Sequence, residues 1–194
     1  MDSTLTAIDH SIQLFLLNLL RPGSVTGEVS HWLDGPMIAL STLGDWGMVW
    51  IAAALVLLIF PKTRKWGVGI GIALLLSLTV ANGLLKHLID RPRPCMAFPI
   101  QSLMLIPNPG ESSFPSGHTT SSFAAAMVLM GWKKKAGIPA FLLAGLIGLS
   151  RLYLYVHYPS DVLCGMLLGI GLGALALWIL KKIPLFRQKE KRVG

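Results

Sequence analysis

Long apolar runs dominate this chain, and short polar or basic stretches separate them. A helix needs about 20 mostly apolar residues to cross a hydrocarbon core about 30 Å thick, and several of the runs approach that length. The five runs cover residues 46–60, 66–89, 117–132, 137–155 and 162–180. This pattern predicts an all-α membrane protein built as a helical bundle.

The N-terminal 45 residues carry shorter apolar runs. Residues 8–20 are too few to cross a bilayer, so we expect an interfacial helix there. Residues 34–43 are expected to form a further short helix or an extension of the next span, and a broken or tilted sixth crossing stays open. The predicted fold is therefore a bundle of five to six transmembrane helices. We divide the chain into an N-terminal part (1–45), a transmembrane core (46–182) and a basic tail (183–194).

Glycines spaced four residues apart predict where helices pack closely. Gly165, Gly169 and Gly173 share one face of the last span, and Gly67 and Gly71 have the same spacing in the second span. Small residues at this spacing let two helix backbones approach each other within a membrane.

Composition and charge support the membrane assignment. Hydrophobic residues make up 53% of the chain and charged residues 13%, against about 25% charged residues in soluble domains. The net charge of +8 could suggest nucleic acid, but 12 of the 17 basic residues fall in three stretches that each follow an apolar run. Such stretches are typical of cytoplasmic loops and argue against a nucleic-acid partner. They comprise Lys62, Arg64 and Lys65; Lys133, Lys134 and Lys135; and Lys181, Lys182, Arg187, Lys189, Lys191 and Arg192.

The first of three clusters of chemically suggestive residues ends the second apolar run. It contains Lys86 and, seven positions later, Arg93. Lys86 alone could reach the membrane surface or pair with Asp90 one helical turn later. Arg91 also precedes a proline, so the sequence leaves open which arginine points inward. Cations grouped at the end of a span nevertheless suggest a functional site.

The second cluster, Pro115-Ser116-Gly117-His118, begins the third apolar run. Taken alone, Ser116 is typical of an N-cap and Gly117 of a turn. A helix N-terminus that exposes backbone N–H groups is also suited to bind phosphate, and His118 lies in its first turn. We therefore predict proton transfer as the role of His118.

The third cluster contains Ser150, Arg151, His157 and Asp161. Asp161 could simply cap the last helix, and Arg151 could reach the membrane surface. An acid four residues after a histidine can also hold one imidazole nitrogen, which leaves the other nitrogen available as a nucleophile. Each cluster is a weak signal alone, but together they indicate a phosphoryl-transfer enzyme.

Charge counting places the three clusters on one side of the membrane. With five alternating spans, the three basic stretches share one side, which then holds 12 basic residues and one acid. The other side holds five basic and eight acidic residues. The positive-inside rule makes the first side cytoplasmic. We therefore expect a multi-pass cell-membrane protein with the clusters on the extracytoplasmic face and the C-terminus in the cytoplasm.

Together the clusters read Lys86-x6-Arg93-Pro94, Pro115-Ser116-Gly117-His118 and Ser150-Arg151-x5-His157-x3-Asp161. This order resembles the signature of the type 2 phosphatidic acid phosphatase (PAP2) superfamily, over about residues 46–182. The resemblance implies that His157 is the nucleophile and forms a phosphohistidine, that Asp161 orients it and that His118 protonates the leaving oxygen. The residues implied to hold the phosphate oxygens are Lys86, Arg93, Ser116, Gly117 and Arg151. The resemblance implies no metal or other cofactor, and the sequence has no clustered carboxylates of the kind that magnesium sites use.

The compact chain looks most like the undecaprenyl-diphosphate phosphatases of that superfamily. This implies hydrolysis of undecaprenyl diphosphate in the bilayer to undecaprenyl phosphate and phosphate. A phosphatidylglycerophosphate or phosphatidate phosphatase is the alternative, because glycine at position 117 leaves the choice open. From a different class, the chain could be a lipid-binding or transport protein without hydrolysis. We also expect the loop 95–114, with seven large apolar residues, to form a lid that contacts lipid.

Overall fold

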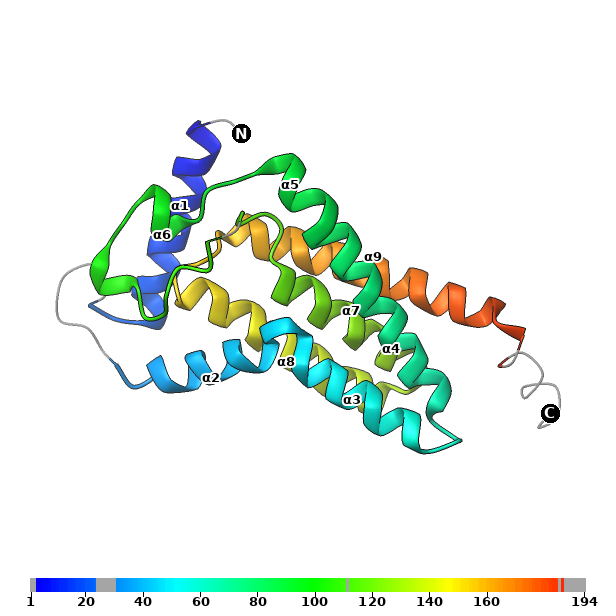
Figure 1. The fold of residues 1–194 in the computed structure, drawn as a ribbon. Coiled ribbons are helices and arrows are strands. Elements are labelled where there is room, and N and C mark those ends of the chain that lie inside the picture. Colours follow the sequence, from blue (N-terminus) through cyan, green and yellow to red (C-terminus); the bar gives the residue numbers. More distant parts are fainter. Residues whose placement is uncertain (1–2, 24–30, 111, 185, 187–194) are drawn as a thin grey trace.

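The protein folds as a bundle of helices (Figure 1). The computed structural model describes residues 3–23, 31–110, 112–184 and 186, and this part contains no strand. In chain order the elements are α1 (Ser3–Leu20), α2 (Asp34–Gly44), η1 (Asp45–Gly47), α3 (Met48–Ile59), α4 (Arg64–Ser77), η2 (Leu78–Leu85), α5 (Lys86–Ile89), α6 (Pro94–Ala97), η3 (Gln101–Leu103), α7 (Gly117–Trp132), α8 (Lys134–Tyr153) and α9 (Pro159–Lys182). The predicted all-α fold is confirmed.

Four helical stretches of the described chain are long and apolar enough to cross a membrane. They are Asp34–Ile59, Arg64–Ala97, Lys134–Tyr153 and Pro159–Lys182. The 16-residue α7 is shorter and packs against α4, α8 and α9 in the middle of the bundle (Figure 1). Because its neighbours are mostly protein, α7 buries small and polar residues such as Thr120, Ser122 and Ala125. Each of the five predicted runs corresponds to a helical stretch.

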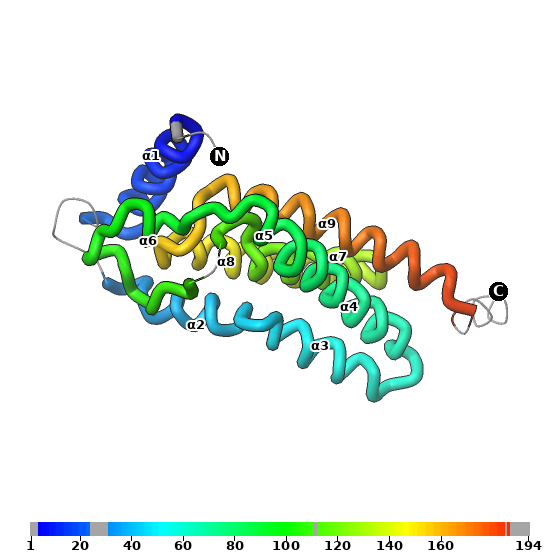
Figure 2. Tube along the Cα trace, turned by 45° about the horizontal axis from the view of Figure 1, so that its top comes forward, coloured from blue at the N-terminus to red at the C-terminus, as the bar shows by residue number. Residues whose placement is uncertain are grey.

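The N-terminal helix α1 leans away from the bundle axis (Figure 2). Its outward face is apolar, with Phe15 and Leu19 about 70% exposed. Its inward face buries Asp9 and Gln13. An apolar outer face suits contact with lipid. The prediction of an interfacial helix stays a prediction, because helix position alone does not fix membrane depth.

Residues 34–43 were expected to form either a short helix or an extension of the next span, and helix α2 combines the two. It is a short helix of 11 residues, and it continues into α3 through the bend η1, where Trp46 has a φ of 54° and Gly47 a φ of 69°. Left-handed backbone of this kind breaks the run of helical hydrogen bonds and changes direction. The predicted domain boundary at residue 45 thus falls inside a bent helical stretch.

The second apolar run forms one continuous helical stretch from α4 through η2 to α5. The segment η2 is a π-helix, whose wider turn adds a residue to the helix and often occurs at functional sites. It carries Asn82, and Lys86 follows directly after it. The widened turn therefore sets the direction in which these two side chains leave the helix.

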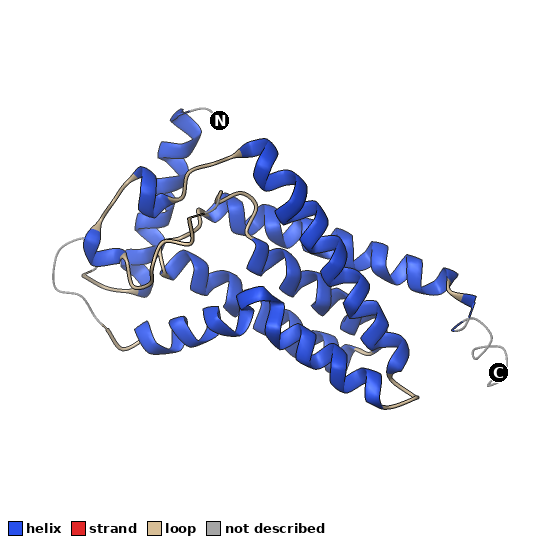
Figure 3. Cartoon of the chain, in the orientation of Figure 1, coloured by secondary structure: helices blue, strands red, loops and turns tan. Residues whose placement is uncertain are grey.

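The connections between helices lie at the two ends of the bundle (Figure 3). One end carries the α5–α7 loop and the α8–α9 turn, and the other carries the α3–α4 turn and the end of α9 (Figure 1). Lys62 lies in the α3–α4 turn, and Lys181 and Lys182 end α9. The predicted basic tail, 183–194, lies almost entirely outside the described residues.

The described part of the loop 95–114 is neither fully packed nor fully exposed, and five of its seven large apolar residues are half-buried. Leu103 is completely buried and packs in a cluster with Leu17 of α1 and Tyr153 of α8, while Met96 is exposed. The expectation that the apolar loop residues contact lipid was wrong for Leu103, because α1 covers it. Ile106 and Pro107 line the cavity described below.

Three of the five predicted packing glycines lie on the α7–α9 contact. A Cβ atom at Gly165 would lie 2.9 Å from the carbonyl oxygen of Ser116, and one at Gly173 would lie 2.6 Å from that of Ala124. A Cβ atom at Gly169 would come closer still to the carbonyl oxygen of Thr120. Gly67 is confirmed as well, since its Cβ would lie 2.7 Å from the carbonyl oxygen of Ala54. Gly71 was predicted wrongly, because its surroundings are open within 4 Å.

We expect Gly169→Ala to lower the thermal unfolding temperature in detergent, because the new methyl group meets the Thr120 carbonyl and helices α7 and α9 must separate. Overpacking of this kind costs about 1–3 kcal/mol. Gly171→Ala is the matched control on the same helix, since nothing lies within 4 Å of its Cβ position. The control is expected to keep or slightly raise the unfolding temperature. Equal unfolding temperatures for the two variants would contradict the close α7–α9 contact.

Candidate active site

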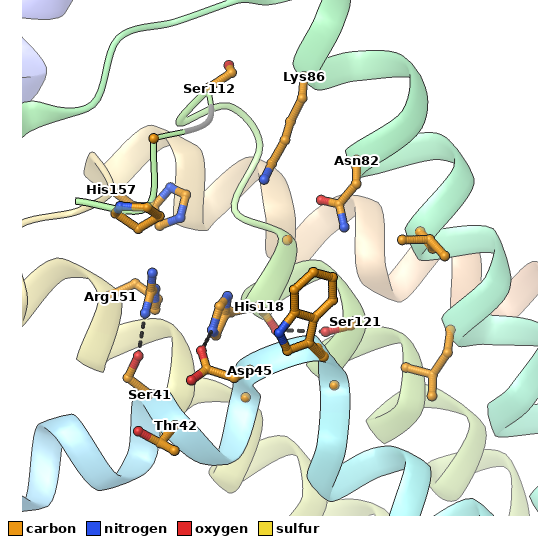
Figure 4. Close-up of a pocket in the computed structure, with 18 of the residues that line it drawn as sticks. Ser41, Thr42, Asp45, Asn82, Lys86, Ser112, His118, Ser121, Arg151 and His157 are labelled. Atoms are coloured by element: carbon orange, nitrogen blue, oxygen red, sulfur yellow. Dashed lines mark hydrogen bonds and ion pairs between the residues drawn. The ribbon is translucent and has the colours of Figure 1, made fainter. Parts of the chain in front are cut away.

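Six of the eight predicted site residues line one cavity of about 1220 Å³. They come from four parts of the chain: the region of α5 and the loop after it, the start of α7, the end of α8 and the α8–α9 turn. Figure 4 shows Lys86, His118, Arg151 and His157 converging on the same space. The six are Lys86, Arg93, Gly117, His118, Arg151 and His157, while Ser116 and Asp161 lie fully buried behind the wall.

His157 lies in the α8–α9 turn and is 2% exposed. Its Nε2 is 3.1 Å from Nη1 of Arg93. A guanidinium can only donate, so Nε2 is the unprotonated nitrogen and Nδ1 carries the proton. Burial, reinforced by the positive charges of Arg93 and Arg151, holds the pKa of His157 well below its ordinary value. The ring is therefore a neutral imidazole whose Nε2 lone pair is on the side of Arg93.

Asp161 lies behind His157 in the first turn of α9 and is completely buried. Its Oδ2 accepts a hydrogen bond of 2.9 Å from the backbone N–H of Tyr158 and lies 3.6 Å from Nδ1 of His157. That distance is longer than a hydrogen bond, although the carboxylate faces the protonated ring nitrogen. Asp161 therefore caps the helix and also faces the histidine.

The two arginines that the sequence could not tell apart point in different directions. Arg93 lines the cavity and donates to the carbonyl oxygen of Val156 over 2.9 Å. Arg91 is 2% exposed and lies between two carboxylates, 2.7 Å from Oδ1 of Asp161 and 2.8 Å from Oδ2 of Asp9. Arg91 thus fixes the carboxylate behind His157, while Arg93 faces the cavity.

Helix α1 contacts the back of the site. Gln13 donates from Nε2 to the carbonyl oxygen of His157 over 2.9 Å. One helical turn earlier, Asp9 accepts from Arg91 and from both the backbone N–H and the hydroxyl of Ser160. Neither Asp9 nor Gln13 was predicted as a site residue. A polar residue inside an apolar helix was the available signal, because such residues are costly in a membrane unless they have partners.

Two cavity side chains are held by residues of α2 and η1. Nε2 of His118 is 2.8 Å from Oδ1 of Asp45, and Nη1 of Arg151 donates to the hydroxyl of Ser41 (Figure 4). Neither Asp45 nor Ser41 was predicted as a partner of these side chains. The one signal for Asp45 was an acid between two glycines at the border of an apolar run.

The second cluster combines an N-cap with a close backbone contact. The Ser116 hydroxyl accepts from the backbone N–H of Thr119 over 3.4 Å and from its hydroxyl over 2.9 Å, so Ser116 is the N-cap of α7. Gly117 lines the cavity, and a Cβ atom there would lie 2.7 Å from Oδ1 of Asn82. A side chain at position 117 would therefore push the Asn82 amide away from the start of α7.

The cavity brings three cationic side chains together with two histidines. Lys86, Arg93 and Arg151 supply cations that suit the oxygens of a phosphoryl group. The backbone at the start of α7 adds N–H groups at the positive end of a helix. Within the described residues, no group of three or more His, Cys, Asp or Glu side chains is placed to hold a metal ion.

Known proteins are similar to this chain in sequence and in fold. Residues 66–184 match the PAP2 superfamily. The chain is 34% identical over 148 residues to an undecaprenyl-diphosphatase of Sulfolobus acidocaldarius, covering 76% of this chain and 70% of that protein. It is 35% identical over 130 residues to undecaprenyl-diphosphatase BcrC of Bacillus subtilis, covering 64% of this chain and 66% of that protein. A solved transmembrane PAP2-type phosphatidylglycerolphosphate phosphatase of Bacillus subtilis is similar in structure, with a TM-score of 0.68, 26% identity and coverage of 95% of this chain and 90% of that one.

Proposed function

The chain belongs to the PAP2 superfamily, and from that premise we propose that it hydrolyses undecaprenyl diphosphate through a phosphohistidine on His157. At the coarser level, it is a membrane lipid phosphatase of that superfamily. The observation that supports the finer proposal is the neutral, buried His157, whose Nε2 lies among the cations of the cavity.

In the first step of this mechanism, the Nε2 lone pair of His157 attacks phosphorus. The bond from phosphorus to the leaving lipid oxygen breaks, and His118 donates a proton to that oxygen. The Asp161 carboxylate, which faces Nδ1 of His157 at 3.6 Å, stabilises the positive charge that the attacked ring acquires. The products of this step are the lipid and a phosphorylated His157.

The second step releases phosphate. A water molecule attacks the phosphohistidine, the phosphorus–nitrogen bond breaks and the water proton passes to His118. Both histidines then return to their starting states. Lys86, Arg93 and Arg151 stabilise the charge on the phosphoryl oxygens in both transition states, aided by the backbone N–H of Gly117 and by Ser116.

The cavity wall supports a lipid substrate. Besides the charged residues, the cavity is lined by Leu74, Leu75 and Leu78 of the α4–η2 stretch and by Ile51 of α3. A lipid chain can lie against these side chains while its phosphate reaches His157. We place this cavity on the extracytoplasmic face and the C-terminus in the cytoplasm, because the basic α3–α4 turn and the end of α9 lie at the other end of the bundle (Figure 1).

Undecaprenyl diphosphate is the preferred substrate because two relatives of about one third identity carry the name undecaprenyl-diphosphatase. The structural similarity to a phosphatidylglycerolphosphate phosphatase supports the alternative. A non-hydrolytic lipid-binding protein would have no need for the His157–Asp161 arrangement.

We expect the purified protein to release phosphate from undecaprenyl diphosphate with a kcat/KM at least about tenfold above that for phosphatidylglycerophosphate or phosphatidate, a difference of about 1.4 kcal/mol. The measurement is phosphate release in mixed detergent micelles at matched surface concentrations of each lipid. A reversed order would establish the alternative substrate. Binding of all three lipids without phosphate release would instead support the non-hydrolytic class.

A further inference from the structure

The contact between Asp45 and His118 joins two distant parts of the chain. Asp45 is the first residue of the bend η1, and His118 lies in the first turn of α7. Oδ1 of Asp45 and Nε2 of His118 are 2.8 Å apart, a normal hydrogen-bond distance. Because this contact occupies Nε2, only Nδ1 of His118 remains for another partner.

The backbone before Asp45 fits closely around the same ring. A Cβ atom at Gly44 would lie 2.8 Å from Cδ2 of His118 and 2.8 Å from Cγ2 of Ile147. The helical stretch then turns sharply through the left-handed backbone of Trp46 and Gly47. The bend therefore brings both a backbone surface and a carboxylate against His118.

The charges around His118 come from several elements. Arg151 of α8 and Lys86 of α5 place positive charge beside the ring, and Asp45 of η1 places negative charge there. His157 of the α8–α9 turn also faces this region and is neutral. A histidine that must carry a second proton needs a carboxylate to offset neighbouring cations. Figure 4 shows Asp45 on one side of the His118 ring, with Lys86 and His157 on the other.

We propose that Asp45 is a positioning residue that holds His118 through Nε2, directs Nδ1 toward the phosphoryl group and stabilises the doubly protonated ring. This inference rests on the proposed role of His118 as the proton donor. Nδ1 gives its proton to the leaving oxygen as the bond from phosphorus to oxygen breaks. Nε2 keeps its own proton, which stays hydrogen-bonded to Oδ1 of Asp45. When water attacks the phosphohistidine, Nδ1 takes the water proton, so the cycle closes without a net change.

Rates measured with leaving groups of different acidity distinguish a positioning role of Asp45 from a purely structural role. Phenolate leaves phosphorus poorly without a proton, whereas 4-nitrophenolate leaves readily without one. We expect Asp45→Asn to lower kcat for phenyl phosphate by about 10–100-fold, the size of effect seen when the hydrogen-bonded partner of a metal-binding histidine is removed. The loss for 4-nitrophenyl phosphate is expected to be much smaller. Thr42→Val is the matched control, since Thr42 lines the same cavity from α2 and its hydroxyl donates to the carbonyl oxygen of Ile38 in its own helix.

The pH profile gives a second readout on the lipid substrate. Asp45→Asn removes the negative charge that favours the protonated ring, so the alkaline limb of kcat is expected to move to lower pH. An equal loss for both aryl phosphates with an unmoved alkaline limb would overturn the proposal, as would wild-type rates for both. If His118→Gln keeps the wild-type dependence on the leaving group, the proton-donor role of His118 itself is wrong, which is a different result.

A measurement on the unsubstituted protein keeps the inference testable if Asp45→Asn does not fold. Nitrogen-15 NMR of the protein labelled at histidine is expected to show a protonated, hydrogen-bonded Nε2 on His118. A neutral ring with its proton on Nδ1 and a bare Nε2 would refute the contact.

Discussion

His157→Ala is expected to abolish phosphate release while the protein stays folded and inserted in the membrane. The substitution removes the Nε2 lone pair that faces Arg93 in the cavity, and no other side chain replaces it at that position. Removing a nucleophile from an enzyme of this kind costs a factor on the order of 10⁴ or more in kcat. The backbone carbonyl of residue 157 stays bonded to Gln13, so the α8–α9 turn keeps its position.

The measurement combines turnover with trapping of the intermediate. Acid-labile phosphate is expected on the unsubstituted protein after rapid mixing with lipid substrate, attached to Nε2 rather than Nδ1 of His157. The alanine variant is expected to trap none. His31→Ala serves as the histidine control, because the His31 side chain is 68% exposed and distant in sequence from the site. Retained turnover in His157→Ala would sink the nucleophile assignment, and phosphate on Nδ1 would contradict the tautomer inferred from Arg93.

Asp161→Asn is expected to lower kcat by about 10²–10⁴-fold, with little change in KM. Arg91 donates to Oδ1 of Asp161 and the backbone N–H of Tyr158 donates to Oδ2, so an asparagine keeps only one of the two acceptors. The hydrogen bond from the charged guanidinium is the stronger one, so the asparagine oxygen would turn toward Arg91 and the Tyr158 N–H would lose its acceptor. The amide nitrogen would then occupy the place of Oδ2 and present a donor to Nδ1 of His157. The ring would shift its proton to Nε2, which removes the attacking lone pair. The expected magnitude is taken from serine proteases, in which replacing the triad aspartate by asparagine fixes the wrong histidine tautomer and lowers kcat by about 10⁴-fold.

The test for Asp161 measures kcat, KM and the unfolding temperature together. Asp161→Asn is expected to fold, because Asp9 still pairs with Arg91 over 2.8 Å. A purely structural role would lower the unfolding temperature and reduce the fraction of active protein while leaving kcat per active molecule unchanged. A kcat within tenfold of the wild type, measured per folded molecule, would refute the orienting role.

The helical bundle was predictable because membrane helices obey local rules. Residues 117–132 were expected as one span and form α7 with those bounds. The ends of other helices moved by a few residues, as α8 begins at Lys134 rather than Gly137. Gly71 shows the limit of the spacing rule, because the same four-residue interval occurs at a helix contact and beside an open cavity. Spacing identifies a face of the helix, but not what covers that face.

Most candidate residues of the site could be predicted from the sequence, as the helices could. Lys86, His118 and His157 were singled out from unusual polar positions in an apolar chain, and the structure brings them to one cavity. Their chemical roles stay proposals. The partners of these residues were not predictable, since Asp45 is 73 positions from His118 in the chain and no local pattern connects them.

The sequence by itself determined the helices, the family signature and the uneven charge, because apolar run length, motif spacing and loop composition are properties of neighbouring residues. Only the tertiary structure decided that Arg93 faces the cavity while Arg91 pairs with Asp9 and Asp161. It also decided that the inward face of α1 supports His157 and that the bend η1 holds His118. The physical reason is that a buried charge must pair with an opposite charge. The packing of helices that are distant in sequence decides which opposite charge lies within hydrogen-bond distance.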